Sequence, residues 1–433
     1  MNTVNRHDDA RLDQLRAEAH EHYREARPNS EALHHQARKV LPGGNTRSVL
    51  HFEPFPFRVD SAHAQTLTDI DGLEYTDFCG NYTAALLGHS PTRVKAAVSE
   101  VLNDGWALGA THPREVELAE LICDRFPSID QVRFTNSGTE ANLMAIGTAL
   151  HHVGDHGGDS TRTVIGVFDL AYHGGVLAFG PLGGPHNPMN VPHEFQVAPF
   201  DDIAGLDELF KADLACVLVE PVQGSGGCRP PSLEFLRELR RRCDETGTVL
   251  IFDEVMTSRL GPGGAQQRFD VVPDMTTLGK YLAGGMTFGA FGGRREIMAA
   301  FEPDRPGALT QAGTFNNNIV SMTAAITTLR HELDADSLGE LNDRGDRLRH
   351  DLQGAFEAAG APLWVTGLGS MLCVHSADDR LIDLYFHAML DQGLYLARRG
   401  FMALSKAITD DDCARLVDAT RTWGDQLFGR SDQ

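Results

Sequence analysis

Residues 133–150 have the sequence RFTNSGTEANLMAIGTAL, which joins an apolar strand to a long helix through a short polar turn. The helix is expected to begin near Gly138. Ser137 and Glu140 have the spacing of a capping box, in which the two side chains accept hydrogen bonds from N–H groups at the helix start. We predict a phosphate site at this helix start. The remaining backbone N–H groups and the hydroxyls of Ser137 and Thr139 could donate hydrogen bonds to a phosphate, and Gly138 permits its close approach. A plain capped helix would show the same pattern, so this stretch alone leaves the function open.

Around this stretch, short apolar runs alternate with helical patterns from about Pro91 to Leu329. Such alternation predicts an α/β domain with a mostly parallel sheet. Upstream, Asp71-Gly72 separates two short alternating runs and indicates a β-hairpin. Downstream, helices and short strands indicate a smaller α+β domain. The expected segments are 1–70 (an N-terminal arm and part of the small domain), 71–330 (the large domain) and 331–433 (the C-terminal small domain).

Composition excludes several classes of function. The chain has 433 residues and a net charge of −22, which opposes nucleic-acid binding because phosphate contacts need clustered Lys and Arg. No run of about 18 apolar residues indicates a membrane span. The polar segment Met1–Ala10 does not resemble a signal peptide. The seven cysteines form no C-x-x-C pair, and the histidines show no metal-ligand spacing, so we expect a cytoplasmic protein without a metal.

Two further residues carry chemistry. Asp253 ends the apolar run VLIFD, and ligands of open α/β sheets lie at the carboxyl ends of strands. A carboxylate in an apolar setting needs a cationic partner, either a protonated ring nitrogen of a ligand or an arginine. Lys280 stands between Gly279 and Gly284-Gly285 in an uncharged stretch, where burial would disfavour its ammonium form and make it a nucleophile. A surface lysine would fit the same local sequence.

Taken together, these motifs resemble the class-III aminotransferases of fold type I, which use pyridoxal 5′-phosphate (PLP). The resemblance covers nearly the whole chain. In detail, the sequence is most similar to the β-amino-acid (β-phenylalanine) branch of this family, and glutamate-1-semialdehyde aminomutase is a relative. It implies a large domain with a mostly parallel seven-stranded sheet. The motifs that carry it are LPGGNTRS (41–48), TDIDGLEYTDF (68–78), GHSP (88–91), RFTNSGTEAN (133–142), YHGG (172–175), VEPVQG (219–224), LIFDEVMTSR (250–259), TTLGKYLAGG (276–285), FGAFGGRREIM (288–298) and AGTFNNN (312–318).

The resemblance also implies roles at matching positions. Lys280 would bind PLP as a Schiff base and move the proton between the substrate carbon and the cofactor. Asp253 would pair with the ring nitrogen, while Val255 and Tyr172 would cover the two ring faces. The other cofactor-binding residues implied are Ser137, Gly138 and Thr139 at the phosphate, Thr314 from the neighbouring subunit of a homodimer, and Glu220 and Gln223 near the phenolic oxygen. Glu220 could equally be a structural carboxylate.

For the substrate, an amino-acid carboxylate is best held by the planar fork of an arginine. The resemblance gives this role to Arg47 and, for the keto acid, to Arg399, although the adjacent Arg398 leaves open which of the two enters the site. Tyr82 is expected at the substrate. Apolar walls could come from Phe52, Phe55, Phe57, Tyr82 and Phe401, each of which could also be a core residue.

The predicted function is transfer of an amino group from a β-amino acid to a keto acid such as 2-oxoglutarate or pyruvate. An aminomutase is the alternative, but its motifs place the arginine later than in GGNTRS (43–48) and differ from GTFNNN (313–318). Decarboxylation or racemisation on the same cofactor stays open, because the protein selects which bond is labile. A non-catalytic cofactor-binding protein would also fit the fold, but it would not require an intact Lys280.

Overall fold

The computed structural model describes residues 6–156 and 162–429, so the predictions for Met1–Asn5 and for the last four residues lie outside the described part. The chain divides into two compact units, one comprising 1–90 with 343–433 and the other 91–342. Within the described ranges, no helix combines the length and the apolar character needed to span a bilayer.

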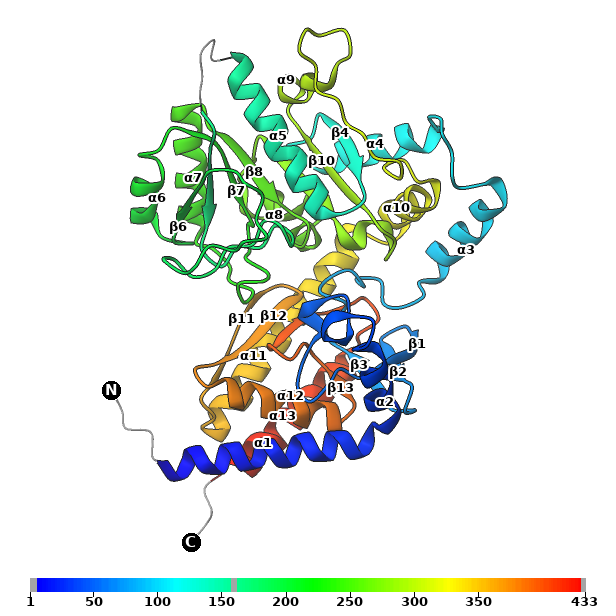
Figure 1. Ribbon diagram of the computed structural model, residues 1–433, viewed down its shortest axis with the longest axis vertical. Coiled ribbons are helices and arrows are strands. Elements are labelled where there is room, and N and C mark those ends of the chain that lie inside the picture. The colour runs from blue at the N-terminus through cyan, green and yellow to red at the C-terminus, as the bar shows by residue number, and fades with distance from the viewer. Residues whose placement is uncertain (1–5, 157–161, 430–433) are drawn as a thin grey trace. The chain divides into compact units, whose positions relative to one another are not determined.

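The second unit is built on a seven-stranded sheet in the order β4-β10-β9-β8-β7-β5-β6 (Figure 1). Only β10 runs antiparallel to its neighbours, so the sheet is mostly parallel as predicted. The strands are β4 (Gln131–Thr135), β5 (Val164–Phe168), β6 (Phe195–Ala198), β7 (Leu214–Val219), β8 (Val249–Asp253), β9 (Met275–Gly279) and β10 (Gly289–Gly293).

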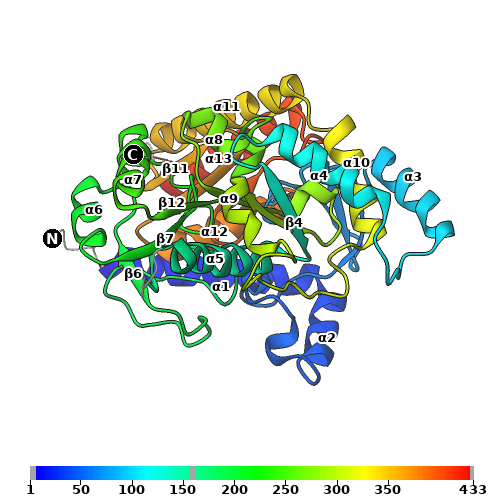
Figure 2. The same cartoon turned by 90° about the horizontal axis from the view of Figure 1, so that it is seen from above.

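Both faces of this sheet are buried, because successive residues of its strands enter different cores. Cys216 and Leu218 of β7 pack with α5, whereas Val217 and Val219 pack with α6 and α7. Figure 2 shows α5 and α7 on opposite sides of β7. The helices of this unit are α3 (Thr92–Val101), α4 (Pro113–Arg125), α5 (Gly138–His156), α6 (Ile203–Leu209), α7 (Leu233–Thr246), α8 (Gly264–Phe269), α9 (Arg295–Met298) and α10 (Ile319–His331), and α11 (Ala335–Ala359) continues into the first unit.

The first unit holds two smaller sheets, β1-β2-β3-β13 and β11-β12-β14. The predicted hairpin is present, since β2 and β3 pair antiparallel across Asp71-Gly72. Its elements are α1 (Arg6–Ala26), α2 (Pro28–Ala37), β1 (Val59–His63), β2 (Thr66–Asp69), β3 (Glu74–Asp77), β11 (Leu363–Leu368), β12 (Met371–Ser376), α12 (Asp379–Asp391), β13 (Leu394–Tyr395), β14 (Phe401–Ala403) and α13 (Asp410–Phe428).

The unit boundaries fall at residues 90 and 342, later than the expected 70 and 330. The reason is strand pairing. Strand β3 pairs in parallel with β13, with Thr76 opposite Leu394 and Asp77 opposite Tyr395. This pairing places the hairpin with the C-terminal segment rather than with the seven-stranded sheet.

Candidate active site

A cavity of about 290 Å³ lies where β8 and β9 end and α5 begins. This is the position at which open α/β sheets bind ligands. Most of the cofactor residues expected from the sequence line it, although they come from five separate stretches of chain: Ser137, Gly138, Thr139, Tyr172, Glu220, Asp253, Val255 and Lys280.

Asp253 is the last residue of β8 and is 4% exposed. Its Oδ2 accepts a hydrogen bond from Nδ2 of Asn142 (2.8 Å) and lies 2.8 Å from Nδ1 of His173. Its Oδ1 accepts the N–H of Val255 at 3.0 Å. These groups fix the carboxylate at the wall of the cavity. An ionised carboxylate has only acceptor sites, so this position suits a protonated nitrogen of a bound ring.

Lys280 follows β9 directly and starts a short 3₁₀ turn, Lys280–Ala283. Its φ is +52°, a left-handed conformation that is uncommon for a residue with a side chain. The turn is packed closely against the start of α5, because a Cβ on Gly279 would lie 3.4 Å from the backbone nitrogen of Gly138. The lysine is therefore held in a fixed backbone geometry beside the expected phosphate site, as is frequent at functional residues.

The start of α5 differs from the predicted capping box in one bond. Ser137 Oγ accepts the N–H of Glu140 at 3.2 Å, as predicted. Glu140 Oε2, however, accepts the N–H of Asn136 at 2.8 Å instead of that of Ser137. Glu140 therefore does not occupy the Ser137 N–H group. The first N–H groups of a helix have no partner within it, so this end keeps donors for an anion.

Two glycines let the backbone come close to the floor of the cavity. A Cβ on Gly138 would lie 2.7 Å from Cγ2 of Val255, and one on Gly174 would lie 2.2 Å from Oγ1 of Thr139. Gly174 also has a φ of +123°, which side-chain-bearing residues rarely adopt. Both positions therefore require glycine.

Glu220 and Tyr172 are linked through the backbone. Glu220 Oε2 accepts the N–H of Tyr172 at 3.0 Å, and its Oε1 accepts the N–H of Gly224 at 3.1 Å. Burial, aided by the nearby charge of Asp253, raises the pKa of Glu220 to about 7. Tyr172 itself is 45% exposed, so its ring has an open face for stacking.

Two predicted cofactor residues do not line the cavity. Gln223 is fully buried, and its Nε2 donates to the carbonyl of Asp169 at 2.7 Å. Thr314 lies in an exposed turn of the same chain. The predicted contact of Gln223 with the cofactor has no support from this arrangement, and Thr314 was expected to act on a neighbouring subunit.

Sequence reasoning missed Asn142 and His173, which hold Asp253. Asn142 also accepts a hydrogen bond from Oγ1 of Thr277 at 2.6 Å, so it joins α5 to β9. A signal was available for both residues, since each belongs to a quoted motif, RFTNSGTEAN or YHGG. Neither motif says which strand its polar side chain will face.

The predicted substrate residues gather in the first unit. The guanidinium carbon (Cζ) of Arg47 lies 5.7 Å from the centre of the Tyr82 ring, and that of Arg399 lies 5.5 Å from it. The Tyr82 ring stacks on Phe401 at 5.4 Å. Arg47 Nη1 donates to Oδ1 of Asn81 at 2.7 Å. Two cations thus share one aromatic platform, an arrangement that cation–π attraction supports.

Arg398 and Arg399 have different partners within the first unit. Arg398 Nε donates to Asp383 Oδ1 at 3.0 Å, while Arg399 reaches the aromatic pair. The upstream phenylalanines are core residues, because Phe52 and Phe55 are buried with Tyr23 and Tyr75, and Phe57 packs against them.

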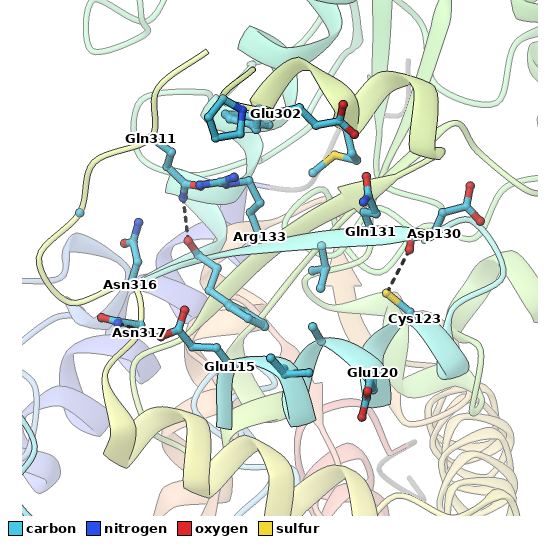
Figure 3. A pocket seen from close by; sticks show the side chains of 18 of the residues that line it. Glu115, Glu120, Cys123, Asp130, Gln131, Arg133, Glu302, Gln311, Asn316 and Asn317 are labelled. Carbon is cyan, nitrogen blue, oxygen red and sulfur yellow. Dashed lines mark hydrogen bonds between the residues drawn. The ribbon is translucent and has the colours of Figure 1, made fainter. Parts of the chain in front are cut away.

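A larger cavity of about 880 Å³ lies elsewhere in the second unit, between α4, the edge strand β4 and the segment around 301–317 (Figure 3). Arg133 projects into it and donates from Nε to Oε1 of Gln311 at 2.6 Å. Gln311 Nε2 in turn donates to the carbonyl of Phe134 at 2.7 Å and so covers part of the strand edge. This cavity contains none of the predicted cofactor residues.

Comparison with known proteins agrees with this geometry. The family model for class-III aminotransferases matches residues 50–422. The chain is 41% identical to the β-phenylalanine transaminase of Variovorax paradoxus, with 95% of this chain and 96% of the relative covered. The chain belongs to the class-III aminotransferases.

Solved structures extend this result. A β-phenylalanine aminotransferase from Variovorax paradoxus superposes on this aminotransferase with a TM-score of 0.90 at 40% identity, covering 95% of this chain and 97% of that one. A glutamate-1-semialdehyde aminomutase from Pseudomonas aeruginosa shares the fold, with a TM-score of 0.87 at 22% identity and coverage of 96% and 99%. The predicted family, fold type and transaminase activity are confirmed, and the aminotransferase depends on PLP.

The cavity of the aminotransferase suits this cofactor. It offers a buried carboxylate for a ring nitrogen, helix N–H groups for a phosphate and a lysine for a carbonyl carbon. In addition, Nε2 of His173 is buried without a hydrogen-bond partner beside the carboxylate. A Cβ on Gly138 or Gly174 would displace Val255 or Thr139, both of which line this cavity.

Proposed function

We propose that this aminotransferase moves the amino group of a β-amino acid, aromatic or aliphatic, to a 2-keto acid such as 2-oxoglutarate or pyruvate. The observation that carries the proposal is the pair of guanidinium groups, Arg47 and Arg399, that lie near the same aromatic ring, Tyr82. Donor and acceptor each bring a carboxylate, and two arginines offer each of them a planar fork. The named activity of the Variovorax paradoxus relative supports the same donor class.

In this proposal the second unit binds the cofactor. Ser137, Gly138 and Thr139 bind the phosphate at the start of α5, and Asp253 holds the ring nitrogen protonated. Tyr172 and Val255 cover the ring faces, while Glu220 lies towards the phenolic oxygen. Bound PLP supplies an electron sink that stabilises negative charge on the substrate carbon.

Lys280 is the proposed catalytic residue, together with Asp253. With PLP bound, its amine would hold the cofactor between turnovers and, once released, would carry a proton from the substrate carbon to the cofactor side. The turn at φ +52° fixes the backbone from which the Lys280 side chain extends at the cavity wall. Asp253 would act by accepting a hydrogen bond from the ring nitrogen, because its carboxyl group is fixed at the cavity wall.

We also propose a homodimer in which Thr314 binds the phosphate of the neighbouring subunit. Thr314 is exposed, and the adjacent Phe315 is 63% exposed. A second cavity, of about 300 Å³, is lined by Phe315 and by Trp106, which is 53% exposed, and it shares Met286 with the cofactor cavity. Exposed large apolar groups of this kind mark association surfaces. The seven cysteines are all free thiols, which supports a cytoplasmic location.

The donor proposal is tested by following the two half-reactions separately. A panel of α- and β-amino acids is mixed with PLP-loaded enzyme without a keto acid, and absorbance reports conversion of the cofactor to its amino form. We expect rapid conversion with β-amino acids, followed by recovery on addition of 2-oxoglutarate or pyruvate. Turnover of a single semialdehyde without any acceptor would favour an aminomutase, and faster conversion by α-amino acids would remove the β-donor proposal.

The role of Lys280 is tested by Lys280→Ala. We expect loss of the absorbance of the covalently held cofactor and a fall in kcat of at least about a thousandfold, the scale expected when a nucleophile and proton carrier is removed. Lys211→Ala is the control, because Lys211 is exposed and pairs only with Glu208. Circular dichroism should show both variants folded. Unchanged turnover in Lys280→Ala would exclude the catalytic role.

A further inference from the structure

Arg398 and Arg399 are adjacent, yet their side chains have different partners. Arg398 Nε donates to Asp383 Oδ1 at 3.0 Å, whereas Arg399 lies over the Tyr82 and Phe401 rings at 5.5 and 5.6 Å. The turn that carries them is narrow, since the N–H of Gly400 donates to the carbonyl of Ala397 at 2.7 Å. A narrow turn alone does not select which of two neighbouring arginines faces the aromatic platform.

Asp383 lies on α12, and its side chain is completely buried. Its Oδ2 accepts a hydrogen bond from Nε of Arg16 at 2.7 Å and lies 2.8 Å from Nε2 of His20, and both of these residues belong to α1. Burial alone would raise the pKa of this carboxyl, but the hydrogen bonds from His20, Arg16 and Arg398 outweigh it and hold the pKa below its usual range. Asp383 is therefore a charged group that connects α1, α12 and the arginine turn.

This cluster resembles a metal site, because His20, Asp383 and His387 offer ligand atoms within 4.8 Å of one another. Two guanidinium groups, from Arg16 and Arg398, already contact the same carboxylate. A divalent cation would have to displace them or bind beside them against charge repulsion. The observed partners therefore favour a purely ionic cluster.

We propose that Asp383 is a positioning residue for substrate recognition: by binding Arg398 it leaves Arg399 as the arginine that faces Tyr82 and receives the keto-acid carboxylate. The inference rests on the proposed role of Arg399. The Arg398–Asp383 bond anchors the narrow turn that also carries Arg399. Without this anchor the Arg399 guanidinium group would not be held in one orientation over Tyr82, and orientation of bound groups is what a transfer reaction requires.

The N-terminal helix has a different part in this arrangement. Arg16 and His20 contact Oδ2 of Asp383, whereas Arg398 contacts Oδ1. Loss of Arg16 would weaken the docking of α1 on α12 and leave the Arg398–Asp383 bond in place. This difference provides a matched control, because Arg16 and Arg398 have equally exposed side chains (34%) and the same carboxylate partner.

The test compares Arg398→Met, Arg16→Met and Arg399→Ala in PLP-loaded enzyme, with the donor and acceptor half-reactions measured separately. For Arg398→Met we expect the apparent KM for the keto acid to rise about tenfold, the effect of losing one charge-assisted hydrogen bond that orients a binding group, with kcat and the donor half-reaction unchanged. Arg398→Lys, which keeps the charge without the fork, should fall between Arg398→Met and the wild type. Arg16→Met should match the wild type in both half-reactions.

Each result decides the inference. An unchanged acceptor KM in Arg398→Met, or an equal rise in Arg16→Met, would overturn it while the role of Arg399 stood. If Arg399→Ala left the acceptor KM unchanged, the proposed role of Arg399 would fail together with the inference. Thermal unfolding and cofactor absorbance are recorded for every variant, and a general loss in both half-reactions of Arg398→Met would indicate a merely structural residue and also count against positioning. If Arg398→Met did not fold, Arg398→Lys would decide the inference. A KM for the keto acid in Arg398→Lys equal to that of the wild type would overturn the proposed role of Asp383.

Discussion

Glu220 is the buried acid of the cavity whose ionisation is costly. Because its pKa is raised to about 7 from 4.5, the folded chain holds its proton more tightly than the unfolded chain does. The stabilising contribution is therefore complete below pH 4.5 and disappears as the pH rises through 7. In Glu220→Gln this dependence is absent. Between pH 4.5 and 8 the unfolding free energy of the cofactor-free wild type should fall by about 3 kcal/mol relative to the variant.

Urea unfolding at a series of pH values measures this difference. Glu208→Gln is the matched control, since the Glu208 side chain is exposed and forms an ion pair with the exposed side chain of Lys211. Its unfolding free energy should follow the wild type at every pH. Parallel pH profiles for Glu220→Gln and the wild type would show that Glu220 ionises normally in the folded chain.

At the same scale, sequence reasoning proposed Lys280 and Asp253 and missed residues that act through another residue. Lys280 and Asp253 were proposed because the motifs that contain them match those of a known family, although each local stretch allows another interpretation. Asn142 and His173 were missed because their function is to hold Asp253, and that contact joins segments 80 and 111 residues apart. A one-dimensional pattern contains no information on which strand a polar side chain will face.

The start of α5 is the element on which the phosphate site depends. Gly174→Ala would place a Cβ 2.2 Å from Oγ1 of Thr139 in a conformation that alanine rarely adopts. Displacing this hydroxyl should weaken PLP binding at least about tenfold, the equivalent of roughly 1.4 kcal/mol. Gly175→Ala is the control, because nothing lies within 4 Å of its added Cβ. Equal cofactor affinities in the two variants, measured by titration of the apoenzyme, would contradict this account.

Elements held by local signals were predicted well. The strand ending at Thr135 and the helix starting at Gly138 follow from an apolar run, a polar turn and a capping pair that are contiguous in sequence. The compact unit that contains the N-terminus extends to residue 90, beyond the expected segment 1–70, and β3 in this extension pairs with β13, more than 300 residues away. Glu140 accepts a hydrogen bond from the N–H of Asn136 instead of that of Ser137, and the spacing of these residues in the sequence permits either bond.

At the scale of the whole molecule, the proposed dimer makes a complementation prediction. Lys280→Ala and Thr314→Asp should each be inactive alone, the second because a carboxylate repels the cofactor phosphate. If Thr314 acts on the neighbouring subunit, a mixed dimer contains one site with both Lys280 and Thr314 intact. Equal co-expression should then restore about a quarter of wild-type activity, since half of randomly mixed dimers are mixed and each has one good site.

Measured activity of the purified mixture, beside each variant alone and with molar mass from light scattering, checks this expectation. A mixture no more active than the sum of its two components would show that Thr314 acts within its own subunit. A monomeric wild type would remove the proposed interface altogether.

The proposed cofactor residues all lie between residues 91 and 342, whereas the proposed substrate arginines lie in the flanking segments. An evolving gene can therefore alter the choice of amino donor through changes near its two ends while the central segment that performs the chemistry stays intact. If the flanking segments are exchanged between two relatives, the preference for the amino donor should accordingly move with those segments. This separation offers enzyme engineers a region for randomisation that spares the reaction itself.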